Sequence, residues 1–220
     1  MGWWISKCFW NLNIYTNQRH LALAYGLSLS IIYLSMTLKT QKHRVLLQSI
    51  VIAISMSALL YIHLPAAGMT TLFLLWIFFM KKDARETLLL SGLWSVPAFL
   101  FLTRATHLMS PITKEFGYLI KEPITLISFV TYWVYNIGLH IIFIPLGILL
   151  SPRSVRRLVV VPLLFLFIIP NVFRLSPDMI NNHKFINFFM IIANMFSAYA
   201  IVWLWRFLQK QIVLIRSIGR

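Results

Sequence analysis

Cysteine, acidic residues and the common catalytic signatures are scarce in this chain. Cys8 is the only cysteine, so the chain can form neither an internal disulfide nor a metal site built from cysteines. Asp and Glu together number only 5 among 220 residues. The sequence contains no glycine-rich phosphate loop, no HExxH pattern and no Gly-x-Ser-x-Gly pattern. We therefore expect no metal and no cofactor.

Charged residues of both signs are also few. They make up 11% of the chain, against 60% hydrophobic residues, whereas a soluble domain carries about 25% charged residues. The 20 Lys and Arg lie mostly in the short gaps between apolar blocks and give a net charge of +15. This placement is typical of contact with membrane lipids that carry anionic headgroups, and it argues against nucleic acid as the partner.

The apolar residues form seven blocks, which predict an all-α polytopic transmembrane bundle of about seven spans in a single domain, residues 1–220. A helix of 18 residues rises about 27 Å, close to the ~30 Å hydrocarbon core of a bilayer. Residues 63–68 are weakly polar and predict a break between two spans, while Asn136, Gly138 and Pro145 predict a kink within the fifth span. The expected spans are 21–38, 45–62, 65–80, 88–102, 124–150, 158–173 and 185–205.

The distribution of basic residues predicts the orientation of the bundle. With seven spans, 13 of the 20 Lys and Arg fall on the side opposite the amino terminus, in the shorter segments. Short basic segments stay in the cytoplasm. We therefore expect a multi-pass protein with its amino terminus outside or luminal and its carboxyl terminus cytoplasmic.

Polar and basic residues gather on the amino-terminal side, just before the first and the last spans. Arg19 and His20 precede the first span, and Arg174, His183 and Lys184 surround the connection to the last. If these two spans lie together, the five residues form a cationic pocket that suits the phosphate of a lipid headgroup. The alternative is that they are separate interfacial anchors. Four amides lie near the same boundary: Asn171, Asn181, Asn182 and Asn187.

Small residues at every fourth position predict close helix packing. One stripe, Ala22, Gly26 and Ser30, lies on the first span, and Ala193 with Ser197 offers a matching face on the last. A second stripe lies on the second span at residues 49, 53 and 57. We expect these stripes to pack inside one bundle, with dimerisation as the alternative.

General-base catalysis has few candidates on the amino-terminal side. Glu115 and Glu122 each follow a lysine in the sequence, so Asp178 is the one acidic residue there that looks free to act. A general base must be held within hydrogen-bond reach of the proton that it removes from the substrate. The catalytic residues are therefore unknown, and Asp178 is a weak candidate.

Several short segments resemble the middle and carboxyl-terminal part of multi-pass glycosyltransferases of the C superfamily, which use polyprenyl-phosphate sugars. The segments are 17–20, 63–65, 133–138, 170–174 and 182–184. Those enzymes carry acidic residues in a first outer loop, whereas residues 1–20 contain neither Asp nor Glu. The resemblance therefore implies a lipid-phosphate-binding chain that lacks a catalytic amino-terminal half and is not catalytic alone.

Two other function classes remain open from the sequence. One is a non-enzymatic helical subunit or scaffold of a larger membrane complex. The other is a transporter or lipid-handling protein, which the absence of an acidic residue from the middle of any span disfavours.

Overall fold

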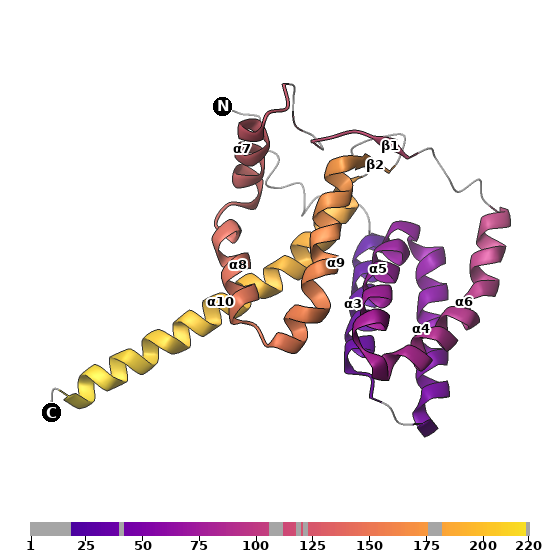
Figure 1. Ribbon diagram of the computed structural model, residues 1–220, viewed down its shortest axis with the longest axis horizontal. Coiled ribbons are helices and arrows are strands. Elements are labelled where there is room, and N and C mark those ends of the chain that lie inside the picture. The colour runs from indigo at the N-terminus through magenta and orange to yellow at the C-terminus, as the bar shows by residue number, and fades with distance from the viewer. Residues whose placement is uncertain are drawn as a thin grey trace.

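A computed structural model describes residues 19–39, 42–105, 112–117, 120, 123–175 and 182–218. The described part is all-α, as expected, apart from two strands of two residues each (Figure 1). In chain order the elements are α3 (Arg19–Thr37), α4 (Lys42–Ile62), α5 (Leu64–Met80), η1 (Lys82–Ala84), α6 (Arg85–Ala105), β1 (Thr113–Lys114), α7 (Leu126–Ile137), α8 (His140–Leu150), α9 (Arg153–Val172), β2 (Phe173–Arg174) and α10 (His183–Ile218).

Four of the described helices are long and apolar enough to cross a membrane, and a fifth crossing is possible through a bent pair. The four segments are His20–Thr37, Arg44–Ile62, Arg153–Val172 and His183–Gln211. The bent pair is α7 with α8. Helix α5 is apolar but shorter, and α6 begins with the charged pair Arg85 and Glu86. All seven apolar blocks therefore form helices, but only four or five of them are both long enough and apolar enough to span a membrane.

The expected break between the second and third blocks occurs at His63. Its backbone is extended, with φ −162° and ψ 93°, so α4 ends at Ile62 and α5 begins at Leu64. The His63 side chain caps α5, because its Nδ1 accepts the backbone N–H of Ala66 at 3.1 Å. Pro65 in the first turn favours a helix start, since it needs no hydrogen bond there.

The expected kink in the fifth block occurs at Gly138. Its φ of +59° and ψ of −138° are accessible to glycine and strained for other residues, and the axes of α7 and α8 meet at 79°. Pro145 causes no interruption, because α8 continues through it from His140 to Leu150.

Helix α5 lies at the centre of the bundle. It contacts α3, α4, α9 and α10, while α4 packs most closely on α6, and α8 on α10 (Figure 1). The core includes three aromatic rings in series: Phe188 of α10 lies 5.2 Å from Tyr25 of α3 and 6.3 Å from Phe73 of α5, measured between ring centroids. These side chains are fully or almost fully buried and hold α3, α5 and α10 together.

The small-residue stripes do not pack as the sequence predicted. Ala22, Gly26 and Ser30 are exposed, and no atom lies within 4 Å of a Cβ built on Gly26. The buried face of α3 is instead the one with Leu21 and Tyr25, because larger side chains bury more apolar area against α5 and α10. Ala193 and Ser197 are buried on the part of α10 that packs against α8, so the predicted pairing of the two stripes is wrong. On α4, the stripe residues Ser49 and Ala53 are buried, as expected.

Basic side chains cover the carboxyl ends of α3 and α5. Lys81 Nζ donates to the Met36 carbonyl at 2.5 Å, which fixes the end of α3 beside the end of α5. Arg85 and Arg157 donate to carbonyls of the last turn of α5, at 3.0 Å to Phe78 and 3.3 Å to Met80. Cations stabilise this end of a helix. The amino ends of α3 and α5 therefore lie together at the opposite end of the bundle.

Candidate functional site

The amino ends of three helices meet at that opposite end. His20 lies in the first turn of α3, His63 precedes α5, and His183 with Lys184 begins α10. The rings of His20 and His63 are 5.8 Å apart. The Tyr25 hydroxyl donates to the Lys184 carbonyl oxygen at 2.7 Å and ties α3 to the first turn of α10. Two of the five residues that the sequence singled out for phosphate, His183 and Lys184, are thus brought near a third, His20.

His63 lies at the centre of this group, and the sequence identified it only as a helix break. The residue is 6% exposed. Burial, followed by the positive charges of Lys184, His20 and His183, lowers the pKa of His63 from 6.5 to about 4, so the ring is neutral at pH 7. Because Nδ1 accepts a hydrogen bond, the proton resides on Nε2. This Nε2 is buried and has no partner among the described residues.

The electrostatics of the group favour an anion. The amino ends of α3, α5 and α10 each contribute a partial positive charge. Lys184 is partly buried, and no carboxylate lies close enough to form a salt bridge with it among the described residues. Asp83 and Glu86 lie beyond the carboxyl end of α5. We call His20, His63, His183, Lys184 and Asn187 the histidine–lysine cluster.

Asn187 adds a second buried donor to the cluster. It lies one helical turn after His183, on the same face of α10, and is 5% exposed. Its Nδ2 is buried without a hydrogen-bond partner in the described part of the chain. A buried amide donor without a partner destabilises the empty site by about 1–3 kcal/mol. An anion that accepted from both His63 Nε2 and Asn187 Nδ2 would remove that cost.

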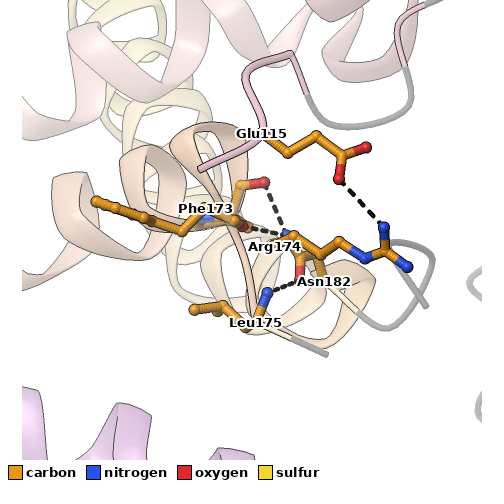
Figure 2. A network of polar contacts seen from close by, with 6 residues as sticks. Glu115, Phe173, Arg174, Leu175 and Asn182 are labelled. Atoms are coloured by element: carbon orange, nitrogen blue, oxygen red, sulfur yellow. Dashed lines mark hydrogen bonds and ion pairs between the residues drawn. The ribbon is translucent and has the colours of Figure 1, made fainter. Parts of the chain in front are cut away.

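Asn182 holds the cluster in place, and both N–H groups of its amide are already used. Its Oδ1 accepts from the Leu175 N–H at 3.2 Å, and its Nδ2 donates to the carbonyls of Pro170 at 3.0 Å and Phe173 at 2.7 Å (Figure 2). The residue is 1% exposed. These three bonds fasten the start of α10 to the end of α9.

Arg174 pairs with Glu115 at the short sheet. It lies on β2, where Thr113 of β1 is its antiparallel partner, and its Nη1 lies 3.4 Å from Glu115 Oε2 (Figure 2). Glu115 therefore pairs with a residue 59 positions away, whereas the sequence associated it with the preceding lysine. Both side chains are partly exposed, and the pair contributes little to stability.

Several sequence-predicted residues lie outside the described part of the chain. They include Asp178, Asn181 and Glu122, and for Arg19 only the backbone is described. Asn136 and His140, which mark the broken span, have structural roles. Asn136 Nδ2 donates to the Tyr132 carbonyl at 2.7 Å, and His140 Nδ1 lies 3.0 Å from Ser197 Oγ, which links α8 to α10.

The histidines are not arranged as a metal site. Among the described residues, no group of three or more His, Cys, Asp or Glu side chains has the geometry to hold a metal ion. The cluster is therefore a set of hydrogen-bond donors and positive charges.

Comparisons with protein-family models, curated proteins and solved structures find no match to this chain.

Proposed function

We propose that this chain is a multi-pass membrane protein that binds the phosphate of a lipid headgroup at the histidine–lysine cluster. The observation that carries the proposal is the meeting of three helix amino ends around a buried neutral imidazole, His63, whose Nε2–H has no described partner. Lys184 supplies the full positive charge.

Phosphate suits this set of groups better than a carboxylate does. The cluster offers donors from three side chains: His63 Nε2, Asn187 Nδ2 and the Lys184 ammonium group. A tetrahedral phosphate has enough oxygens to accept from all of them at once, whereas a planar carboxylate has two. Hydrogen bonds to a charged acceptor are worth about 1.5–3 kcal/mol each.

The positions of the two polar ends support a membrane-spanning arrangement. Helix α5 has 17 residues and therefore rises about 26 Å, with the histidine–lysine cluster at its amino end and Lys81, Arg85 and Arg157 at its carboxyl end. This separation approaches the ~30 Å hydrocarbon core. We propose that seven helical segments cross the bilayer, with α7 and α8 as one broken span. The end with Lys81 faces the cytoplasm because most basic residues lie there.

The lipid we propose is a polyprenyl phosphate, on the strength of the sequence resemblance to lipid-linked-sugar glycosyltransferases. The described acidic residues place no carboxylate base at the cluster, since Glu115 is paired with Arg174 and the other two follow the carboxyl end of α5. We therefore assign this chain a binding role, with sugar transfer requiring acidic residues supplied by another polypeptide.

A second function, that of a helical subunit in a larger membrane complex, is favoured by one observation. The face of α3 that carries the small residues Ala22, Gly26 and Ser30 is exposed. Small residues let another helix approach closely, so this face suits contact with a helix of a partner protein. Lipid binding and assembly with a partner are compatible with each other.

Binding of a phosphorylated lipid by the full chain tests the first function. The chain is placed in nanodiscs of neutral phosphatidylcholine, and a fluorescent polyprenyl phosphate is titrated alongside the matching polyprenol. We expect the phosphate to bind more tightly, and Lys184→Gln to weaken it more than tenfold. Lys82→Gln removes the same charge from an exposed residue at the opposite end and should change little.

Arg174→Gln tests whether Arg174 contributes to phosphate binding, as the sequence predicted. Because the Arg174 side chain faces Glu115, its replacement should change binding less than twofold. Equal affinity for the phosphate and the alcohol, or equal loss in Lys184→Gln and Lys82→Gln, would refute the proposed function.

A further inference from the structure

Two cavities lie beside α9, and the bent pair α7 and α8 lines them. The first has a volume of about 550 Å³ and is lined by residues that include Phe116, Phe129, Phe167 and Asn171. The second has a volume of about 570 Å³ and lies between α8, α7 and α9, with Trp133, Ile141 and Leu163 in its wall. Phe129 and Phe167 line both cavities, so the two adjoin along α9, and we call them together the groove.

The wall of this groove is apolar along most of its length. Every residue that lines the second cavity is apolar or aromatic. In the first cavity the polar residues are Thr125 and Asn171, and none of the lining residues is charged. The Thr125 hydroxyl is already engaged, since it accepts the Ser128 N–H at 3.1 Å in a capping box at the start of α7. Apart from the indole N–H of Trp133 in the second cavity, the polarity of the groove is therefore concentrated at Asn171.

Asn171 has an unused hydrogen-bond acceptor. Its Nδ2 donates to the Phe167 carbonyl at 2.8 Å, but its Oδ1 is buried and has no partner among the described residues. The residue is 2% exposed. A buried carbonyl oxygen without a donor is costly in an apolar wall, and a single water needs two to four polar partners to be held there. Among the described residues, Asn171 Oδ1 therefore lacks a donor.

We propose that this groove binds the chain of a neutral lipid whose terminal hydroxyl donates a hydrogen bond to Asn171 Oδ1. The long apolar wall suits an aliphatic or isoprenoid chain, and the acceptor at one end suits a hydroxyl. A phosphorylated lipid is disfavoured because the lining holds no cation and Oδ1 would repel the phosphate oxygens. This site is separate from the histidine–lysine cluster and does not rest on the function proposed there.

The groove is open to the surroundings through side chains that a lipid would contact. Val130 and Ile141 on the bent pair are 49% and 42% exposed, and Leu164 and Ile168 on α9 are 51% and 47% exposed. A lipid chain can therefore enter sideways from the bilayer, with no passage through water.

The test compares two uncharged probes that differ in one hydrogen-bond donor. A long-chain alcohol with a fluorescent group at the far end and its methyl ether are titrated against the full chain in neutral nanodiscs. One neutral hydrogen bond predicts that the alcohol binds about fivefold more tightly than the ether. In Asn171→Leu the two probes should bind equally.

Asn136→Leu is the matched control. Asn136 makes the same local bond, from its Nδ2 to the carbonyl four residues earlier, but it is exposed and lines neither cavity. This variant should keep the fivefold preference. Filling the groove with Ile168→Trp should weaken both probes together, and circular dichroism establishes that each variant is folded.

Two results would overturn the proposal. One is equal binding of alcohol and ether by the unaltered chain, which needs no variant to fold. The other is an undiminished preference for the alcohol in Asn171→Leu. If Asn171→Leu fails to fold, the comparison of the two probes on the unaltered chain and on Ile168→Trp still decides the outcome.

Discussion

Gly147 is a residue at which α8 and α10 approach closely, and replacing it by alanine should separate them. A Cβ added there would lie 1.9 Å from the carbonyl oxygen and 2.5 Å from the carbonyl carbon of Phe196. Both atoms belong to the α10 backbone, so no side-chain rotation relieves the clash. Ordinary contact begins at 3.4 Å, which means that one helix must move by about 1.5 Å.

The expected free-energy change follows from two opposing effects. Overpacking of a tight contact costs about 1–3 kcal/mol, with a backbone clash at the upper end. Alanine in a helix gains about 1 kcal/mol over glycine. Gly147→Ala should therefore lower the free energy of unfolding by about 2 kcal/mol. The shift should also weaken the link between His140 and Ser197, which are 3.0 Å apart.

Gly92→Ala is the matched control for this substitution. Gly92 lies inside α6, and no atom lies within 4 Å of a Cβ built on it, so only the gain in helix propensity remains. Unfolding of both variants in mixed micelles with increasing denaturing detergent, followed by circular dichroism, gives the comparison. If Gly147→Ala is as stable as Gly92→Ala, the close contact between α8 and α10 does not exist.

Three further predictions concern acid sensitivity, topology and catalysis. Because the pKa of His63 falls from 6.5 in the unfolded chain to about 4 in the fold, stability should be constant above pH 6.5 and decline as pH falls towards 4, and His63→Phe should reduce this decline in denaturation experiments. Reporters fused after Arg220 and within residues 103–123 should report opposite sides of the membrane, and the same side for both would mean that a span is miscounted. The purified chain should not turn over a polyprenyl-phosphate sugar, and turnover that Asp178→Asn abolishes would contradict its binding role.

The sequence predicted the helices and their breaks well, because those features are local. Apolar blocks of sufficient length predict helices, Pro65 marks the start of α5, and Gly138 supplies the backbone conformation of the bend. The position of the bend could be predicted because glycine tolerates dihedral angles that other residues do not.

The faces that the helices turn towards one another could not be predicted in the same way. In α3, apolar residues occur on every side, so the pattern does not indicate whether Gly26 or Tyr25 faces the bundle. The structure buries Tyr25, whose hydroxyl reaches the Lys184 carbonyl 159 residues away. A single sequence contains no pattern that indicates a contact between residues so far apart.

Which residues lie together in the cluster could be predicted only in part, because contacts between distant residues are not indicated by a single sequence. His20, His183 and Lys184 could be grouped because each precedes a span on the same side of the membrane. His63 was missed as a site residue because its position at a helix break already explained it. The ion pair of Arg174 with Glu115 depends on the pairing of β1 with β2, two strands too short to be predicted from the sequence.

The titration of the His63 imidazole by NMR tests the phosphate site most directly. The chain is labelled with nitrogen-15 histidine in neutral nanodiscs, and the pKa of His63 is measured without lipid ligand, with polyprenol and with polyprenyl phosphate. We predict a pKa of about 4 without ligand and the same value with the alcohol. With the phosphate we predict a rise of more than about one unit, because a nearby negative charge favours the protonated ring. A pKa that does not change when the phosphorylated lipid is added would contradict the assignment of this cluster as the phosphate site.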